Sequence, residues 1–433
     1  MDNLTKYIGN IQLWIIMKGK NMVIKRHFKK LITTTLVGIT VLTPINKLSY
    51  AQSKNLIFNN INIEQGISQS TIEDIFQDSE GYIWLGTNDG LNRYNGYEFK
   101  IYNYEEYQNS ISHNGITDIT EDKYGNIWVN TVSGVNKINK KTEKISNYTE
   151  INGKIKEDST TEIIVTKDNN ILVGTYEGLN IYNAKEDRFD IILEQKDGIL
   201  SSCIYSIDED INGNIWIGTE LGLNKLSKDF KVLETYTSES EIYNIFCDDE
   251  NGFVWAGSDS SGLLKIDKNT KEVTQYINDI EDENSIPANQ VGVIIRDSKG
   301  NLWVGTTNGL ARYNEKNDSF DVYKNKVYDK NSLVYNDVRS IIEDREGVLW
   351  VGTYSGISIF DTESSIKYYN AGLDDGYLLS ENMVHGIYED DEGYLWVGSR
   401  TKGVNIIDRE NNTSKSISME NNNVIQSNSI NDI

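Results

Sequence analysis

Residues 78–102, DSEGYIWLGTNDGLNRYNGYEFKIY, contain the pattern that decides the fold of this chain. Asp78 and Gly81 bound a tight turn, because an aspartate side chain can hydrogen-bond its own backbone and glycine adopts positive φ without strain. Asn95 and Gly96 form one of the strongest short hairpin signals. Together with the apolar segment before the stretch, these turns predict four antiparallel strands, at residues 72–77, 82–87, 91–94 and 99–102.

The same pattern recurs along the whole chain and is marked by tryptophan. The marked positions are Trp84, Trp128, Leu172, Trp216, Trp255, Trp303, Trp350 and Trp396, with spacings of 44, 44, 44, 39, 48, 47 and 46 residues. Four strands in roughly 45 residues are typical of one propeller blade. The sequence therefore predicts an all-β protein, a β-propeller of four-stranded antiparallel blades.

The constant residues of the unit indicate how blades pack. An indole repeated at one strand position is expected to lie in the core between blades rather than on a ligand surface. A glycine follows two residues after each marked position, except at Asn130, and lets a neighbouring blade approach closely. The third unit has Leu172 in place of tryptophan and a first turn at 168–170 that is shorter by two residues. We expect it to be the least regular blade.

Eight complete units are present, and a ninth begins at residues 428–430 before the sequence stops at Ile433. A soluble protein should not end inside an inner strand, because the paired edges would be left bare. We therefore interpret the chain as a truncated reading of a longer protein.

The number of blades in the ring has two solutions. Residues 56–61 resemble the fourth strand of a blade, which in a closed ring pairs with the last blade. If that blade is the unit of Trp350, residues 55–365 form a seven-bladed propeller, and 366–433 are the start of a second, incomplete one. The alternative is a single eight-bladed ring that closes on the unit of Trp396.

The N-terminal residues have the composition of a leader. Residues 22–51 read as a secretory signal peptide, with a basic segment, the apolar stretch 31–42 and small residues that place cleavage after Ala51. An uncleaved anchor is the alternative, and both place the rest of the chain outside the cytoplasm. Residues 1–21 fit no part of a leader, so we interpret them as a mis-assigned start and Met22 as the true one.

Charge and cysteine content exclude some classes of function. The formal net charge is 42 − 65 = −23, which repels phosphate backbones and anionic headgroups and argues against nucleic-acid binding. The two cysteines, Cys203 and Cys247, are too few for a disulfide framework and are expected to be buried thiols.

Catalytic patterns are missing from the sequence. The three histidines, His27, His113 and His385, lie far apart, and there is no zinc motif, phosphate-binding loop or nucleophile elbow. Most of the acidic residues fall at the repeated turn, where a structural role is expected. We predict no catalytic residues, no cofactor and no metal.

The stretch 78–102 resembles the two-component regulator propeller repeat, and the resemblance extends over all eight units, roughly 55–410. Similar repeats form the extracytoplasmic sensor part of bacterial hybrid histidine kinases and of propeller-linked diguanylate cyclases. The resemblance implies a sensor for glycans or other extracellular small molecules, joined to the membrane only through a C-terminal part that this chain lacks. It also suggests that the intact protein forms a homodimer.

A ring of small polar residues is the candidate ligand site. Eight residues before the turn aspartate of each unit stand Ser70, Asn114, Thr160, Ser202, Glu241, Asn289, Asn336 and Asn382. Radial symmetry would gather these positions at one mouth of a central channel, with Tyr205, Tyr243 and Tyr335 nearby. Amides, hydroxyls and aromatic rings suit a sugar-like ligand. The alternative is that each residue caps its own turn.

The leading hypothesis is therefore a non-catalytic, ligand-sensing propeller module of a membrane signalling protein. A secreted propeller enzyme acting on polysaccharide is one alternative, and it requires clustered carboxylates or a His, Tyr and Arg set at one channel mouth. A secreted adhesion or scaffold propeller is the other, and it should present an exposed aromatic patch.

Overall fold

The computed structural model describes residues 56–433 apart from 107, 363–370, 372–378, 410–412 and 422–424. These residues form eight four-stranded antiparallel sheets and two short 3-10 helices, η1 (Ile63–Gln65) and η2 (Gln195–Asp197). The prediction of an all-β protein with four-stranded units is confirmed. The proposed signal peptide and the segment before it lie outside the described residues.

In seven of the eight sheets the strands follow one another in sequence as a meander, and in the remaining sheet three such strands are joined by the N-terminal strand β1 (Asn59–Ile61). The first strands are β2 (Ile72–Gln77), β6 (Ile116–Glu121), β10 (Thr160–Val165), β14 (Ile204–Glu209), β18 (Ile242–Asp248), β22 (Val291–Arg296), β26 (Val338–Glu343) and β29 (Val384–Glu389). The second strands are β3 (Ile83–Thr87), β7 (Asn126–Thr131), β11 (Ile171–Thr175), β15 (Ile215–Thr219), β19 (Phe253–Ser258), β23 (Leu302–Thr306), β27 (Leu349–Thr353) and β30 (Leu395–Ser399).

The remaining strands complete the sheets outward. The third strands are β4 (Gly90–Tyr94), β8 (Gly134–Asn139), β12 (Gly178–Asn183), β16 (Gly222–Leu226), β20 (Leu263–Asp267), β24 (Gly309–Asn314), β28 (Gly356–Phe360) and β31 (Val404–Asp408). The fourth strands are β5 (Phe99–Tyr102), β9 (Ile145–Tyr148), β13 (Arg188–Leu193), β17 (Val232–Thr237), β21 (Val273–Tyr276), β25 (Ser319–Tyr323) and β32 (Thr413–Ile417). We number the first seven sheets as blades 1 to 7.

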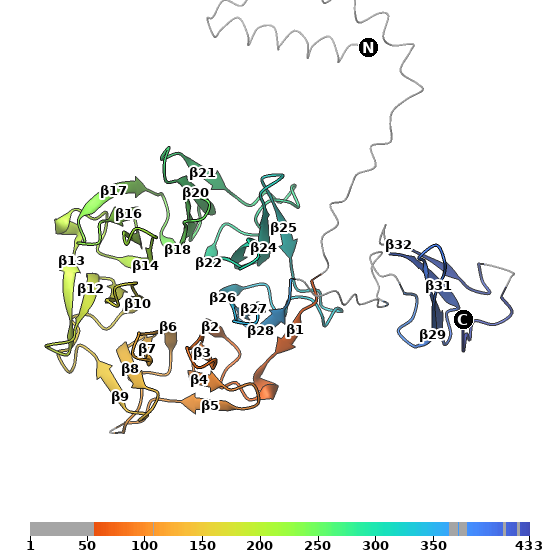
Figure 1. Ribbon diagram of the computed structural model, residues 1–433, viewed down its shortest axis with the longest axis horizontal. Coiled ribbons are helices and arrows are strands. Elements are labelled where there is room, and N and C mark those ends of the chain that lie inside the picture. The colour runs from red at the N-terminus through yellow and green to blue at the C-terminus, as the bar shows by residue number, and fades with distance from the viewer. Residues whose placement is uncertain (1–55, 107, 363–370, 372–378, 410–412, 422–424) are drawn as a thin grey trace, which may run out of the picture. The chain divides into compact units, whose positions relative to one another are not determined.

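Seven blades form a closed ring. The inner strands contact one another in the order β2, β6, β10, β14, β18, β22 and β26, and β26 contacts β2 again (Figure 1). Every blade therefore has a neighbour on both faces, which buries surfaces that a lone meander would leave exposed.

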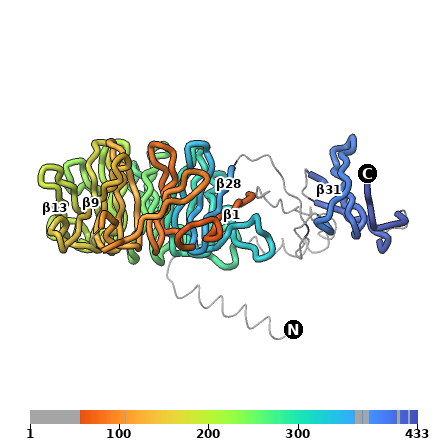
Figure 2. The backbone as a smooth tube through the Cα atoms, turned by 90° about the horizontal axis from the view of Figure 1, so that it is seen from below, coloured from red at the N-terminus to blue at the C-terminus, as the bar shows by residue number. Residues whose placement is uncertain are grey.

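The ring closes through the N-terminal strand β1 (Asn59–Ile61). It pairs antiparallel with β28, with Asn60 opposite Ser358, and so supplies the outer strand of blade 7 (Figures 1 and 2). The Ser358 hydroxyl donates a 2.7 Å hydrogen bond to Asn60 Oδ1. The eighth sheet, β29 to β32, takes no part in this closure. Its assignment to a second propeller stays a prediction, and residues 366–369, expected to begin that propeller, lie outside the described residues.

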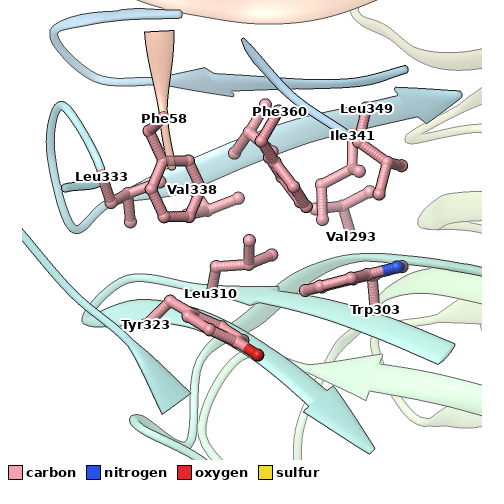
Figure 3. Packing of buried hydrophobic residues seen from close by; sticks show 11 residues of the cluster. Phe58, Val293, Trp303, Leu310, Tyr323, Leu333, Val338, Ile341, Leu349 and Phe360 are labelled. Carbon is pink, nitrogen blue, oxygen red and sulfur yellow. The ribbon is translucent and has the colours of Figure 1, made fainter. Parts of the chain in front are cut away.

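Aromatic side chains fill the space between blades, as expected for the repeated tryptophan. Trp303 of blade 6 is fully buried against Phe360 of blade 7, with ring centroids 5.2 Å apart (Figure 3). Phe58, just before β1, packs on the same ring at 4.9 Å. The side chains of two consecutive blades thus form one hydrophobic cluster.

The turn aspartate holds the tryptophan in place. The indole Nε1 donates to an aspartate Oδ2 in the pairs Trp84–Asp78 (2.9 Å), Trp128–Asp122 (2.9 Å), Trp255–Asp248 (3.2 Å), Trp303–Asp297 (2.9 Å), Trp350–Asp344 (2.7 Å) and Trp396–Asp390 (2.7 Å). The other oxygen of Asp78 accepts the backbone N–H groups of Glu80 and Tyr82. The turn acids are structural, in line with the sequence interpretation.

The first turn of the third blade is more regular than we expected. Thr166 stands six residues before Leu172, which is the spacing of Asp78 and Trp84, so the turn is not shortened. The Thr166 hydroxyl accepts the backbone N–H of Asn170 at 3.0 Å, and Asn169 adopts a positive φ of 62° where other turns have glycine. The expected shortening of this turn was wrong, because threonine and asparagine reproduce the turn chemistry of aspartate and glycine. That blade 3 is the least regular blade stays a prediction.

Both cysteines are free thiols. Cys247 is buried, as predicted, whereas Cys203 is partly exposed. The prediction of a second buried thiol was wrong, because Cys203 precedes its inner strand and lies in the connection from the blade before.

Replacing Gly305 by alanine should destabilise the ring. A Cβ atom there would lie 2.5 Å from Val338 Cγ1 of the next blade and 2.5 Å from Val293 Cγ1. Overpacking of this kind costs about 1–3 kcal/mol. Gly292→Ala in the same blade is the matched control, because its nearest neighbour would be Val338 O at 3.7 Å. Equal unfolding free energies for the two variants would contradict the close approach.

Asp297→Ala should cost about 3 kcal/mol of unfolding free energy, because several buried donors lose their acceptor at once. Asp297 accepts from the Trp303 indole, the Asn301 backbone and the Asn301 amide. Asp168→Ala, at an exposed position of the blade 3 turn, should change stability by less than about 0.5 kcal/mol. Chemical denaturation of both variants checks this, and similar losses would refute the role of the turn carboxylate.

Candidate functional site

The connections between consecutive blades lie on one face of the ring. The inner strands all run in the same direction along the axis of the ring. They therefore begin at the same face, which we call the loop face. The turns after the second strands also lie there. The repeated aspartate turns lie at the opposite face. A ligand that reads differences between blades has most to contact on the loop face.

The predicted asparagines hold the connections of this face. Their side-chain Oδ1 atoms accept backbone N–H groups: Asn114 from Tyr104 (2.7 Å), Asn289 from Asn278 (2.7 Å), Asn336 from Asn325 (2.7 Å) and Asn382 from Ala371 (2.6 Å). Ser202 Oγ accepts from Gln195 N at 2.9 Å. These contacts match the turn-capping alternative. Asn382 belongs to the eighth sheet and not to the ring.

Two of the predicted positions are out of register. Ile72 and Ile242 occupy the same place, opposite Thr87 and Ser258, so the structural equivalent of Ser70 is Ser240 and not Glu241. In blade 3 the equivalent is likewise Asp158 and not Thr160. The two predicted positions are shifted because the turn residue of blade 5 is Asp248 and not Asp249, and that of blade 3 is Thr166 and not Asp168. Ser70 and Glu241 bond only through backbone carbonyls, to Gly356 N and Asp259 N.

Three tyrosines from blades 3, 4 and 5 meet on the loop face. The Tyr205 ring lies 5.1 Å from that of Tyr243 and 6.0 Å from that of Tyr176, in edge-to-face geometry. Tyr176 is 50% exposed and Tyr243 is 37% exposed. Burial, and then the nearby groups of Cys203, Tyr243, Tyr176 and Glu241, raise the pKa of Tyr205 to about 12. We call Tyr176, Tyr205 and Tyr243 the tyrosine cluster.

Sequence reasoning found Tyr205 and Tyr243 but missed Tyr176. The signal was present, since Tyr176 and Tyr354 both follow the threonine that ends a second strand. The predicted Tyr335 packs on Tyr354, with ring centroids 5.7 Å apart, in blade 7. The predicted aromatic residues therefore form two separate groups.

The group at blades 7 and 1 contains its own cation. The guanidinium of Arg339 lies 5.2 Å above the Tyr354 ring. Its Nη1 donates to both carboxylate oxygens of Glu73 at 2.6 Å, and its Nη2 donates to Asp337 at 3.2 Å. Sequence reasoning missed Arg339 and Glu73, which lie at the second residue of their inner strands.

Acidic side chains also link consecutive inner strands. Backbone N–H groups of the next blade donate to Asp74 (Ile119 N, 3.0 Å), Asp118 (Ile163 N, 2.6 Å), Glu162 (Ile207 N, 2.5 Å) and Asp208 (Cys247 N, 2.6 Å). Burial among the inner strands removes water from the Asp118 carboxyl and raises its pKa to about 6. It raises the pKa of Asp74 and of Glu162 well above the ordinary values, with the charge of Asp118 adding to the effect.

The described residues contain no metal-binding cluster, and the cavity of the eighth sheet is not a candidate site. In the part of the chain that the structure describes, no three His, Cys, Asp or Glu residues are placed to hold a metal ion. A cavity of about 360 Å³ on the eighth sheet is lined by Tyr388, Asp390, Trp396 and Ile433. It lies beside the tryptophan position that the ring buries between blades, so we interpret it as a packing face of a blade.

The pKa of Asp118 predicts a pH-dependent stability. Its folded-state pKa of about 6 exceeds the ordinary value of 3.8, so the folded protein keeps a proton that the unfolded chain releases. The contribution of this group to the unfolding free energy should be highest below about pH 4, fall up to about pH 6, and then stay constant. Asp118→Asn should remove this fall, measured as the difference from wild type in urea unfolding across the window.

Asp229→Asn, at an exposed surface position, serves as the control for this titration. If both variants differ from wild type by the same amount at every pH, the raised pKa of Asp118 is wrong.

The family comparison covers the first half of most blades. A family model described as two component regulator propeller matches residues 66–89, 110–133, 198–220, 285–308, 332–355 and 378–401. Each match runs from the connection before an inner strand to the turn after the second strand. Blades 3 and 5 lie outside the matches. Blade 3 lacks the tryptophan and aspartate pair, and in blade 5 these two residues are seven apart instead of six.

Among curated proteins, histidine kinase P4 of Formosa agariphila is 48% identical over 52 residues, which are 12% of this chain and 4% of that protein. Among solved structures, the extracellular domain assigned to a hybrid two-component system of B. thetaiotaomicron matches with a TM-score of 0.72 and 24% identity, over 87% of this chain and 50% of that one. The extracellular domain of an assigned one-component system of the same organism gives 0.58 and 20%, over 86% and 55%.

Virginiamycin B lyase of Staphylococcus aureus matches with a TM-score of 0.54 and 13% identity, over 70% of this chain and 98% of that one. At these identities, likeness to a solved structure shows the fold alone. This chain spans about half the length of the two extracellular domains. The chain is thus a β-propeller, and six of its eight four-stranded units contain a segment that matches the two component regulator propeller repeat.

Proposed function

We propose that this chain is the extracytoplasmic, ligand-sensing part of a membrane signalling protein and has no catalytic activity of its own. Its repeats are of the two-component regulator type, and the extracellular domains of two assigned signalling systems have the same fold. In this proposal residues 22–51 direct export, 55–365 form the sensing ring and 366–433 begin a second propeller. The output domain and the membrane segment belong to a part of the protein beyond this chain.

The tyrosine cluster is the observation that carries the sensing function. Three adjacent tyrosine rings stay partly exposed on the loop face, whereas the repeated tryptophans of the ring pack between blades. Exposed aromatic rings beside polar groups are suited to bind small molecules, sugars among them, by stacking and hydrogen bonding. The proposal places the ligand there and assigns the predicted asparagines to shaping the connections around it.

In this chain no helix among the described residues is long and apolar enough to cross a membrane. The net charge of −23 favours a ligand other than a nucleic acid. Dimerisation of the intact protein remains part of the proposal through the resemblance to its family.

A thermal-shift screen of the full chain against oligosaccharides and small extracellular metabolites tests this function. A true ligand at about 100 times its Kd should raise the melting temperature by about 5 °C. Tyr205→Ala combined with Tyr243→Ala should abolish the shift, whereas Tyr124→Ala, an exposed tyrosine of the opposite face, should retain it. A ligand whose shift survives in the double variant would move the site away from the loop face.

A further inference from the structure

We propose that the tyrosine cluster binds the ammonium group of a small organic cation, with the carboxylates of Glu241 and Asp259 balancing its charge. This inference rests on the proposed sensing function and specifies the chemistry of its ligand. It comes from comparing two places on the loop face that the repeat makes equivalent.

Tyr176 in blade 3 and Tyr354 in blade 7 occupy the same repeat position. Each follows the last residue of a second strand, Thr175 or Thr353, which pairs with the first residue of its inner strand. In blade 7 the next inner-strand residue is Arg339, and its guanidinium covers the Tyr354 ring. The chain thus shows at one position how this face holds a cation, over an aromatic ring and between two carboxylates.

Blade 3 has the ring but lacks the cation. Thr161 stands where blade 7 has Arg339, and its hydroxyl donates to Ile204 O at 2.7 Å. On the next two blades the equivalent inner-strand positions carry Tyr205 and Tyr243. Blade 3 therefore has no cation over the Tyr176 ring, and this ring is followed by those of Tyr205 and Tyr243 in a row of three.

Carboxylates without an ion pair border the tyrosine cluster. Glu241 stands two residues before Tyr243, and its carbonyl accepts the backbone N–H of Asp259 at 3.0 Å, so both acids lie in the segments next to the ring. Burial raises the pKa of Tyr243, and the charges of Asp259 and Glu241 raise it further. In the described residues neither acid forms a salt bridge, and Asp259 accepts only the neutral amide of Gln290, at 2.9 Å. By contrast, Glu73 and Asp337 beside Tyr354 are both paired with Arg339.

Elsewhere the chain covers comparable rings with its own cations. Lys137 lies 5.0 Å from the Trp128 ring, Lys265 lies 5.1 Å from that of Trp255, and Lys100 lies 5.0 Å from that of Tyr102. No Lys or Arg of the described ranges lies over a ring of the tyrosine cluster. Negative ring faces next to unpaired carboxylates attract an external cation and repel an acidic glycan.

Calorimetry of the full chain with choline and with its uncharged isostere 3,3-dimethylbutanol tests the inference. Choline should bind at least about tenfold more tightly, because only the charged ligand gains the ring and carboxylate attraction in a partly desolvated site. Glucosamine and glucose form a second pair that tests a primary ammonium in the same way. Glu241→Gln with Asp259→Asn should weaken binding of the charged member about fivefold or more.

Thr161→Arg supplies a sharper variant, because it offers the tyrosine cluster the cation that blade 7 already has. It should remove choline binding while the melting temperature stays near that of wild type. Thr117→Arg, at the same repeat position in blade 2, should leave choline binding intact. Equal affinities within both ligand pairs, or no binding by either ammonium compound, overturn the inference. The sensing function itself would stand if a neutral compound from the thermal-shift screen still depended on Tyr205 and Tyr243.

Discussion

The burial of one large apolar side chain between neighbouring blades, an indole in six of the seven blades and Leu172 in blade 3, is the constraint on which the ring depends. A buried indole contributes on the order of 3 kcal/mol, and its single polar atom would reduce that gain if it had no partner. In five of the six blades of the ring that carry the indole, the turn aspartate supplies the partner and also organises the turn, as Asp297 does for Trp303, whereas Trp216 Nε1 has no hydrogen-bond partner among the described residues. One carboxylate therefore links the shape of a hairpin to the contact between neighbouring blades.

Ring closure makes this local arrangement cooperative. Strand β1, from the beginning of the ring, completes blade 7, so no blade can lose its neighbour without opening the whole assembly. Acids on the inner strands add a second set of links, each accepting a backbone N–H from the following blade, as Asp118 does from Ile163. Because these packing roles occupy the repeated positions, the loop face is free to differ from blade to blade.

The second residue of each inner strand is one position at which the blades differ. Around the ring this residue is Glu73, Thr117, Thr161, Tyr205, Tyr243, Gly292 and Arg339. Among the five blades that build the tyrosine cluster and the Arg339 group, only blades 4 and 5 have the same residue at this position, a tyrosine. A framework that repeats between blades, with different side chains on one face, is well suited to recognise a ligand. The Arg339 group shows one way in which this face holds a cation, over the Tyr354 ring and beside Glu73.

The sequence by itself determined the four-stranded blade and the propeller class, because a blade is specified locally, whereas the number of blades in the ring was decided by the pairing of β1 with β28. The spacing of the tryptophans, the turn aspartates and the glycines lies within single units, and so does the four-strand pattern. Tertiary structure alone decided which residues meet across blades. The register of Glu241 depended on a one-residue difference in a turn, and the chemistry of the asparagines on which backbone N–H reached them. Tyr176 meets Tyr205 and Tyr243, 29 and 67 positions away, because consecutive blades pack side by side. Arg339 meets Glu73, 266 positions away, only because the ring closes.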